Sequence, residues 1–396
     1  MKIKLGVIFG GDSVEHEVSI ISALQAIENV DEDKYEVVPI YIGKDRTWYT
    51  GNILKKIDTF KEFEMNKKFL TKVVLLRKDG EFVLLKTNGI FRSEVTKIDV
   101  AFPVVHGKGV EDGSLAGYLD SIGIPFVGPG IVGASLGQDK VLLKQMLIAN
   151  GINTPSYTWF YDYEFLNDTD KVLDDCERLG YPVIVKPANL GSTIGITVAH
   201  NRKELDSAIN EACKYEKKIL VEVMVENLVE VNCAILGNHE KQRPSLIAKM
   251  LTDNELLTFD DKYLSGTGSK KNGSKVSGGG KMSNSSFEIP AKLDKEVEEK
   301  VFKMALDTFR VLNLKGVCRI DFLINEKTKE VYVNEPNTIP GSLSFYMFKP
   351  DGLEYRELIN ELVRIAIKEY NDNKKKVSSF DSSILNGYNG SKGVKK

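Results

Sequence analysis

The sequence has few of the features that mark disulfide-rich, zinc-binding or membrane-spanning proteins. Its 396 residues include only four cysteines (Cys176, Cys213, Cys233 and Cys318), and none lies in a CxxC pair. A zinc site or redox pair is therefore not expected, and free thiols are typical of a cytosolic chain. No apolar run reaches the roughly 18–20 residues of a membrane span, and the start MKIKLGVIFGG lacks the form of a signal peptide. We expect a cytoplasmic protein without a membrane segment.

An excess of charge of one sign is also missing. The 54 basic and 56 acidic residues leave a formal net charge of −2, which gives no global reason to expect a nucleic-acid partner. The hydrophobic fraction of 42% and the charged fraction of 28% are those of a soluble globular protein. The chain is too long for one ordinary core, so its length suggests two or three domains.

Strands and helices alternate in the first third of the chain. An apolar strand at Lys4–Phe9 runs into a glycine turn, a helical pattern at Glu17–Asn29 and a second strand at Tyr35–Ile42. The same order returns in residues 99–127 as strand, helix and strand. This alternation predicts an open parallel α/β domain over residues 1–133.

The rest of the chain reads as two further units of α/β and α+β type. A helix at Asp139–Asn150 precedes a small α+β unit, and mostly strands follow, with amphipathic helices at Lys295–Leu312 and Glu354–Tyr370. We expect a central subdomain at 134–218 and a C-terminal subdomain at 219–370 with a mobile loop at 255–290. Residues 265–286 and the tail 371–396 are rich in Ser, Gly, Lys and Asn, and such segments bury too little apolar surface to become ordered.

The segment GVCRIDFLINEKTKEVYVNEPNTIPG (316–341) predicts a β-hairpin with chemistry at one end. Because strand side chains alternate faces, Arg319 and Asp321 can share one face, as can Glu335 and Asn337. Two carboxylates and an amide oxygen suit Mg²⁺, and the arginine suits a phosphoryl or carboxyl oxygen. A surface hairpin with solvated acids explains the same spacing.

Three other segments place polar groups beside glycines or at strand ends. GVIFGGDSVEHEVSIISA (6–23) puts Glu15 at a helix start, where a carboxylate either meets a ligand or only stabilises the helix. GYPVIVKPANLGSTIGITVA (180–199) carries Lys186 and a Gly/Ser/Thr loop that can cradle phosphates, although it lacks P-loop spacing. In ILVEVMVENLVEVNCAILG (219–237), Glu222 and Glu230 are either nucleotide ligands or solvated strand-end acids.

Taken in order, these segments resemble those of the ATP-grasp ligases, and most closely the D-alanine–D-alanine ligase family. The resemblance runs from about residue 3 to about residue 368, and its most specific pieces are GGDSVEHEVS, HGKGVEDG, KPANLGSTIG, RIDF and NEPNTIPG. It implies a three-domain ATP-grasp architecture with an N-terminal open parallel α/β domain. It also implies ATP-dependent ligation of two D-alanines through an acyl phosphate, for peptidoglycan precursors and cell-wall biogenesis.

The resemblance assigns a role to each candidate residue. For ATP it implies Lys140, Lys186, Ser192, Thr193, Glu222, Met224, Val225, Glu230 and Lys262. For catalysis it implies Glu15, Ser192, Arg319 and Tyr263, and for the amino-acid substrates Ser19, His106, Gly341 and Ser344. For two Mg²⁺ ions, with Mn²⁺ as an alternative, it implies Asp321, Glu335 and Asn337. The family is typically a homodimer.

The chain departs from the family pattern at Val110, Ala116, Pro336 and Tyr346 and in the insertion 265–286, and the last two changes touch the acceptor side. After NTIPG this chain continues GSLSFYMFKPDG, with Tyr346 where the family places a serine that helps to hold the second substrate, so Ser344 is the candidate substitute. Two alternatives to a D-alanyl-D-alanine product therefore stay open. One is a related ligase whose acceptor is D-serine, D-lactate or another amino acid. The other is a nucleotide-binding pseudoenzyme.

Overall fold

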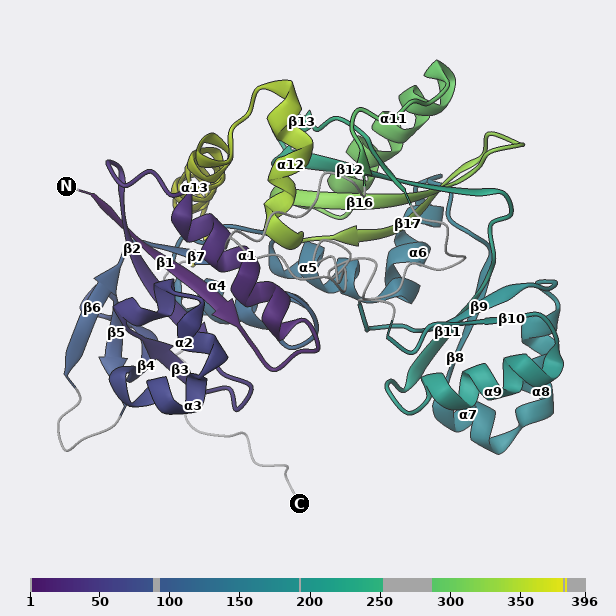
Figure 1. Ribbon diagram of the computed structural model, residues 1–396, viewed down its shortest axis with the longest axis horizontal. Coiled ribbons are helices and arrows are strands. Elements are labelled where there is room, and N and C mark those ends of the chain that lie inside the picture. The colour runs from purple at the N-terminus through teal and green to yellow at the C-terminus, as the bar shows by residue number, and fades with distance from the viewer. Residues whose placement is uncertain (1, 88–92, 192–193, 252–286, 380–381, 383–396) are drawn as a thin grey trace, which may run out of the picture.

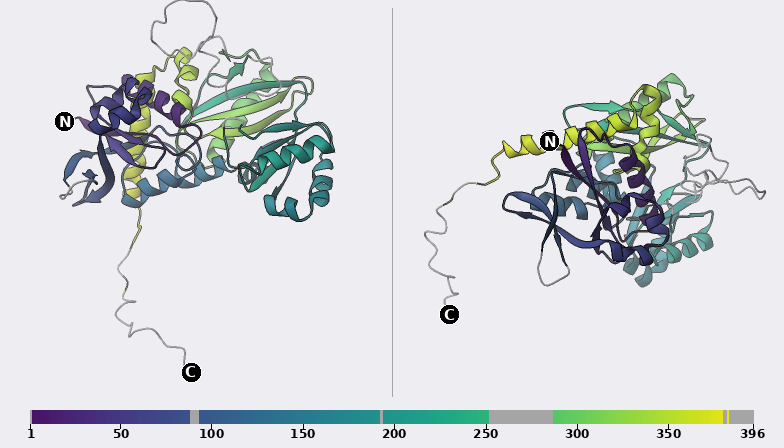
Figure 2. Two further views of the ribbon diagram at one scale, coloured as in Figure 1. Left: turned by 60° about the horizontal axis from the view of Figure 1, so that its bottom comes forward. Right: turned by 60° about the vertical axis from the view of Figure 1, so that its left-hand side comes forward.

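The computed structural model describes residues 2–87, 93–191, 194–251, 287–379 and 382. These residues form three sheets, one in each of three parts that lie side by side (Figure 1). The N-terminal part lies on the left of that view, the C-terminal sheet in the middle and a smaller central unit at the lower right. In the left view of Figure 2 the central unit lies beside the C-terminal sheet.

The N-terminal sheet has the strand order β6-β5-β4-β3-β2-β1-β7. The apolar strand β1 (Ile3–Gly10) runs parallel to both β2 (Tyr35–Ile42) and β7 (Val100–Pro103), as the βαβ pattern predicts. Strands β3 to β6 extend this sheet in antiparallel fashion, so the sheet is mixed and the expected open parallel sheet covers only three of its strands. The strand expected at Pro125–Val127 forms only an isolated bridge between Phe126 and Ala101.

Helices of the N-terminal part pack on this sheet. Its remaining strands are β3 (Trp48–Thr50), β4 (Thr71–Lys78), β5 (Glu81–Lys86) and β6 (Glu94–Ile98). Its helices are α1 (His16–Glu28), α2 (Asp58–Lys61), α3 (Phe63–Asn66) and α4 (Ser114–Ile122). The turn from β1 to α1 needs glycine, because a Cβ on Gly10, at φ +90°, would lie 2.2 Å from the carbonyl oxygen of Ile42.

The central unit is an antiparallel sheet with the order β10-β9-β11-β8 and helices on one side (Figure 1). Its strands are β8 (Tyr157–Tyr161), β9 (Val183–Pro187), β10 (Thr197–Ala199) and β11 (Lys218–Val223). Its helices are α7 (Asp162–Asn167), α8 (Thr169–Glu177) and α9 (Arg202–Ala212). Apolar side chains of α8 and α9 pack with those of β9 and β11 in one buried cluster.

The C-terminal sheet has the order β15-β14-β12-β16-β17, with β13 beside β12. Its strands are β12 (Leu228–Gly237), β13 (Gln242–Pro244), β14 (Ala248–Met250), β15 (Phe287–Glu288), β16 (Gly316–Asn325) and β17 (Val331–Asn337). Helices of this part are α11 (Lys295–Val311), α12 (Phe345–Phe348) and α13 (Tyr355–Lys374). The helices α5 (Ile131–Gln138) and α6 (Lys140–Ala149) precede the central unit in the chain, and α6 packs in the core of the C-terminal sheet.

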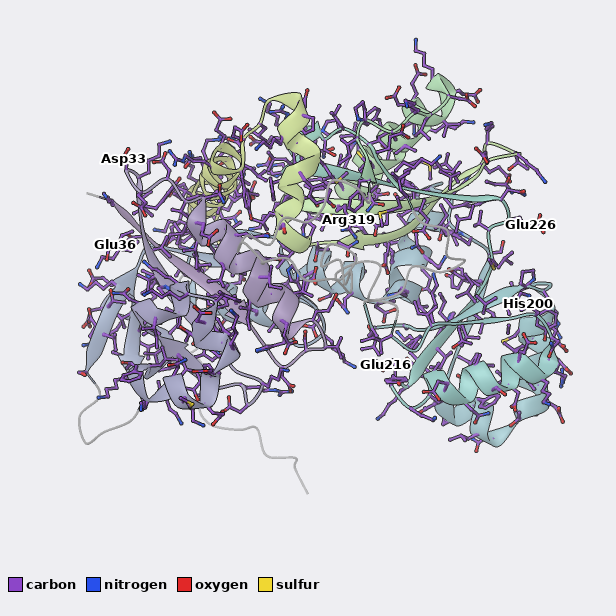
Figure 3. All side chains as sticks on the ribbon, viewed as in Figure 1. Asp33, Glu36, His200, Glu216, Glu226 and Arg319 are labelled. Carbon is purple, nitrogen blue, oxygen red and sulfur yellow. The ribbon has the colours of Figure 1, made fainter. Side chains whose placement is uncertain are left out.

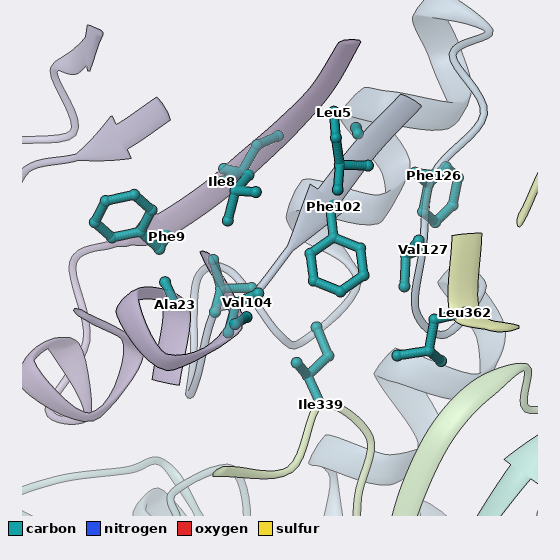
Figure 4. Close-up of a cluster of buried hydrophobic side chains, with 14 of the residues drawn as sticks. Leu5, Ile8, Phe9, Ala23, Phe102, Val104, Phe126, Val127, Ile339 and Leu362 are labelled. Atoms are coloured by element: carbon teal, nitrogen blue, oxygen red, sulfur yellow. The ribbon is translucent and has the colours of Figure 1, made fainter. Parts of the chain in front are cut away.

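Strand β12 is buried on both faces from Val231 to Gly237, although Glu230 and Asn232 interrupt its apolar sequence. Cys233 and Ile235 pack with α6 and α11, whereas Ala234 and Leu236 face the other way, into a cluster shared with α13 and the N-terminal part. That shared cluster is continuous across the two parts. Figure 4 shows Ile339 and Leu362 from the C-terminal part beside Phe102 and Val127 of the N-terminal part.

The expected domain boundaries fall inside secondary-structure elements. The boundary after residue 133 lies within α5, and the boundary after residue 218 lies within β11, which pairs with β8 and β9 and so belongs to the central sheet. Helix α13 continues four residues into the expected tail. Most of the expected mobile loop, residues 255–286, lies outside the described residues, and residues 287–288 form β15. Within the described ranges, no helix combines the length and apolar character that a membrane crossing requires.

Candidate active site

A pocket lies where the three parts of the chain meet. Helix α1 and its loop supply Glu15, β9 supplies Lys186, and the hairpin β16–β17 supplies Arg319 and Glu335. Figure 3 labels Arg319 near the middle of the molecule, between the N-terminal and the central parts. Of the predicted site residues, the lining contains Glu15, His106, Lys140, Lys186, Met224, Val225, Glu230, Arg319, Asp321, Glu335, Asn337 and Gly341.

The hairpin brings its four polar residues together as the sequence predicts. Across β16 and β17, Arg319 lies opposite Asn337 and Asp321 lies opposite Glu335. Arg319 donates to both oxygens of Asp321, from Nε at 2.7 Å and from Nη2 at 2.8 Å. The register shifts after Asp321, which leaves Asn334 as one additional residue on β17. Bulges of this kind commonly redirect side chains next to a functional site.

The oxygen donors on this hairpin fit a hard divalent cation. Asp321, Glu335 and Asn337 all line the pocket, and carboxylate and amide oxygens are the ligands that Mg²⁺ prefers. The Asn337 amide now donates to Asp321 Oδ2 at 3.1 Å, and rotation of this amide would turn its oxygen outward instead. Among the described residues, no three His, Cys, Asp or Glu side chains gather into a metal site. A metal bound here would therefore take further ligands from water or phosphate.

Lys140 reaches this end of the pocket from the first turn of α6. The side chain of Asp139 caps that helix by accepting from the backbone amides of Val141 at 3.0 Å and Leu142 at 3.1 Å. The Nζ atom of Lys140 donates to the carbonyl of Leu190 at 2.7 Å and lies 3.2 Å from Glu335 Oε2. The helix start therefore directs a cation towards the carboxylates of the hairpin.

Glu222 lies in a buried ion network and not on the pocket surface. It is 1% exposed, pairs with Lys186, and lies 2.8 Å from Nζ of Lys144, which is 2% exposed. Burial would raise the pKa of the Glu222 carboxyl, but the two ammonium groups lower it to about 2. Both oxygens face lysines and Glu222 is absent from the pocket lining, so its contact with adenine stays a prediction. Its position supports a role in orienting Lys186, which also donates to Asn334 at 3.3 Å.

Another part of the lining is apolar. Met224 and Val225 lie in the connection from β11 to β12, and Glu230 follows on β12. The apolar side chains beside Met224 and Val225 in this part of the lining are Ile184, Ile196, Leu228, Met250 and Leu323. Apolar walls with a few polar groups are typical of sites that bind a flat organic ring.

The N-terminal part closes the pocket with Glu15 and His106. Gly107 and Gly191 allow the chain to approach Glu15, since a Cβ on either glycine would lie 2.9 Å or 3.1 Å from its Oε2 atom. Gly107 belongs to the N-terminal part and Gly191 to the central unit, so Glu15 lies at their junction. His106 is 4% exposed, and this burial lowers the pKa of its imidazole while the nearby Glu15 opposes the shift.

Two predicted substrate residues do not reach the pocket. Ser19 is fully buried, and its hydroxyl accepts from the Gly10 amide at 2.8 Å and donates to the Val104 carbonyl at 2.6 Å, so it joins α1 to the end of β1 and to the residue after β7. Ser344 is also fully buried and absent from the lining. The predicted Ser192, Thr193, Lys262 and Tyr263 lie outside the described residues.

Glu111, in the motif HGKGVEDG, is a pocket residue that was not predicted. Glu111 lines the pocket and accepts from the amides of Gly107 at 3.0 Å and Ile339 at 2.9 Å and from the Thr338 hydroxyl at 3.1 Å. Burial, and then the charge of Glu15, raise the pKa of this carboxyl to about 7. The signal for Glu111 was its position in a glycine-rich strand-end loop, where ligand-binding residues gather.

Comparison with known families and structures agrees with this geometry. The family described as D-ala D-ala ligase N-terminus matches residues 4–129, and the family described as D-ala D-ala ligase C-terminus matches residues 146–364. A D-alanine–D-alanine ligase from Thermosipho melanesiensis is 36% identical over 385 residues, covering 97% of this chain and 98% of the relative. One from Clostridium novyi is 37% identical over 381 residues, covering 94% and 100%.

Solved structures of similar proteins have the same fold. The D-alanine–D-alanine ligase from Coxiella burnetii superposes with a TM-score of 0.76 at 24% identity, covering 94% of this chain and 96% of that protein. The D-Ala:D-Ser ligase VanG from Enterococcus faecalis superposes with a TM-score of 0.74 at 28% identity, covering 92% and 100%. The fold is thus the three-part ATP-grasp architecture that the resemblance implied. Given both family matches and relatives along nearly the whole chain, this protein belongs to the D-alanine–D-alanine ligase family.

Proposed function

We propose that this ligase uses ATP to join two D-alanines into D-alanyl-D-alanine, a precursor of peptidoglycan. The observation that carries the proposal is one pocket that combines Lys140, Lys186 and Arg319 with the carboxylates of Asp321 and Glu335. The names of its relatives agree with this reaction. The family resemblance also supports a cytoplasmic homodimer.

ATP is needed because a carboxylate is a poor electrophile and becomes reactive as an acyl phosphate. In the proposed site Glu15 receives the ammonium of the first D-alanine, while Lys140 and Lys186 bind the phosphates of ATP as point charges. Arg319 stabilises the phosphoryl group during transfer. Mg²⁺ held by Asp321, Glu335 and Asn337 would neutralise charge on the phosphoryl oxygens.

The second step joins the acyl group to an amine. The amine of the second D-alanine attacks the acyl phosphate, the bond to phosphate breaks, and the oxyanion of the tetrahedral intermediate is stabilised by Arg319 and the Gly341 amide. Water must be excluded from the acyl phosphate, because its hydrolysis would waste the ATP. The family resemblance attributes that exclusion to the segment of Lys262 and Tyr263, which lies outside the described residues.

A different acceptor is the second candidate function. Its support is the similarity to a D-Ala:D-Ser ligase together with the segment that follows Gly341, where Tyr346 replaces the family's serine. The nucleotide side of the site is the same in both cases. The two candidates therefore differ only in the second substrate.

A screen of substrate pairs with Mg-ATP tests the proposal by measuring phosphate release and the dipeptide product together. We expect one phosphate per D-alanyl-D-alanine with D-alanine alone. Turnover only with added D-serine or D-lactate would establish the alternative acceptor, and ATP binding without phosphate release for any pair would identify a pseudoenzyme.

The metal assignment has its own test. Glu335→Gln should abolish phosphate release without changing the circular dichroism spectrum. Glu330→Gln, on the exposed end of the same hairpin, should leave phosphate release unchanged. Near-normal activity of Glu335→Gln would contradict the metal assignment.

A further inference from the structure

The turn after Gly341 has an unusual backbone. Ser342, Leu343 and Ser344 have φ values of +51°, +51° and +52°, so three consecutive residues other than glycine adopt the left-handed conformation. Each such residue costs on the order of 1–3 kcal/mol, and the conformation persists only when surrounding contacts impose it. The contacts that hold this turn are therefore informative about its purpose.

Two side chains of helix α1 hold the start of the turn. The hydroxyl of Ser22 accepts from the Ser342 amide at 3.0 Å, and the Ser342 hydroxyl donates to Oε1 of Gln25 at 2.5 Å. Ser22 and Gln25 are three residues apart, so they lie on the same face of the helix. Ser22 and Ser342 are 2% and 5% exposed, so water cannot replace these bonds without rearrangement. The Ser22 hydroxyl also lies 3.2 Å from Nε2 of His106.

The other end of this segment is held by the N-terminal part as well. Glu111 accepts from the Thr338 hydroxyl and the Ile339 amide, and the Ile339 side chain enters the N-terminal core (Figure 4). Within residues 338–342, Gly341 lines the pocket and directly precedes Ser342, the first residue of the turn. The N-terminal part thus holds the chain both before and after Gly341, at Ile339 and at Ser342, although Gly341 belongs to the C-terminal part.

We propose that Ser22 and Gln25 are positioning residues for the second step of the reaction, in which they hold the turn so that the Gly341 amide points at the reacting carbonyl. This inference rests on the proposed ligase function and deepens it. Phosphates and metal are bound by residues of α6, β9 and the β16–β17 hairpin, none of which contacts Ser22 or Gln25 through a described hydrogen bond. Loss of the two α1 contacts should therefore leave ATP binding intact and impair capture of the acyl phosphate by the amine.

The test compares Ser22→Ala, Gln25→Met and the conservative Ser22→Thr by the ratio of phosphate released to dipeptide formed. A buried hydrogen bond contributes on the order of 1 kcal/mol, so Ser22→Ala should raise that ratio and lower the kcat for dipeptide formation about five- to tenfold, with the KM for ATP unchanged. Ser22→Thr keeps the hydroxyl and should restore the wild-type ratio. The matched control is Ser121→Ala, whose hydroxyl donates only to the Tyr118 carbonyl of its own helix.

Each outcome bears on a different claim. A wild-type protein that makes no dipeptide with any amino-acid pair would contradict the proposed function itself. An active wild type with an unchanged ratio in both Ser22→Ala and Gln25→Met would overturn the positioning role alone. Equal rises in the KM for ATP and for D-alanine, or a Ser22→Thr variant that fails like Ser22→Ala, would also overturn it, since these results indicate general damage to the fold.

Discussion

The buried network around Glu222 predicts that neutralising one carboxylate costs more stability than removing one of its lysines. Glu222 lies between Lys144 of α6 and Lys186 of β9, and all three side chains are at most 9% exposed. Lys144 also donates to the Thr154 hydroxyl at 2.6 Å and to the Pro155 carbonyl at 3.2 Å. The two variants that separate these contributions are Glu222→Gln and Lys144→Met.

The expected magnitudes follow from the charges left behind. Glu222→Gln leaves two buried ammonium groups without their carboxylate, and breaking a buried pair in this way costs about 3–5 kcal/mol. Lys144→Met keeps one carboxylate beside one ammonium and conserves much of the volume, so it removes mainly the two hydrogen bonds, at about 1–2 kcal/mol. In the double variant the loss of unfolding free energy should be smaller than the sum of the two single losses, because only the Lys186 ammonium then stays without its carboxylate.

Trp159 offers an assay that reports on this part of the molecule. It lies on β8, opposite Leu220 of β11, which is the strand that carries Glu222. Trp48 is the only other tryptophan of the chain, so a Trp48→Phe background makes urea unfolding followed by fluorescence specific for the central sheet. Glu226→Gln is the matched control, because that glutamate is exposed and close to Glu222 in the chain.

Two results would refute the reasoning. If Glu222→Gln lowers the free energy of unfolding by less than about 1 kcal/mol, the buried charges compensate each other in some other way. If Lys144→Met costs as much as Glu222→Gln, the hydrogen bonds to Thr154 and Pro155 dominate the network. An effect of Glu226→Gln equal to that of Glu222→Gln would show that neutralisation alone, without burial, is destabilising.

Two further predictions concern the surroundings of the pocket. The pKa of Glu111 is raised from 4.5 to about 7 in the folded protein, so its contribution to stability is fully present below pH 4.5 and is lost as the pH rises through 7. Glu111→Gln should remove this loss, and unfolding midpoints measured from pH 5 to pH 8 should then fall less steeply than in the wild type; parallel curves would contradict the assignment. Asp139→Ala removes the cap of α6 and the ion pair with Lys218 at 2.6 Å, so it should cost about 1 kcal/mol and raise the KM for ATP by displacing Lys140. An unchanged KM would show that Lys140 keeps its place without the cap.

Elements with a strong local signal were predicted well. Strand β2 has the predicted limits Tyr35–Ile42, and β1 extends one residue beyond each predicted end, because continuous apolar runs have few alternatives to a central strand. The β16–β17 hairpin lies within the predicted segment 316–341. Strands β3 to β6 were not predicted. They are short or carry alternating polar residues, and their antiparallel order depends on pairing between segments, which periodicity does not reveal.

The roles of single acids and hydroxyls were harder to predict. Glu222 and Glu230 both follow apolar strand residues in the sequence, yet only Glu230 lines the pocket. Lys144, which faces Glu222, comes from a helix far away in the chain. Ser19 and Ser22 likewise stand on one helix, and their partners Val104 and Ser342 belong to different parts of the molecule.

By itself the sequence determined the family, the order of the motifs and thereby the kind of chemistry, because these depend on residue types and spacings along the chain. It also determined that Arg319, Asp321, Glu335 and Asn337 meet, since a hairpin brings neighbouring segments into register. Only the tertiary structure decided that Glu222 faces two lysines and that α1 holds the turn after Gly341. The energy of a charge or hydrogen bond depends on distance and burial, and both are set by segments that meet only when the chain folds.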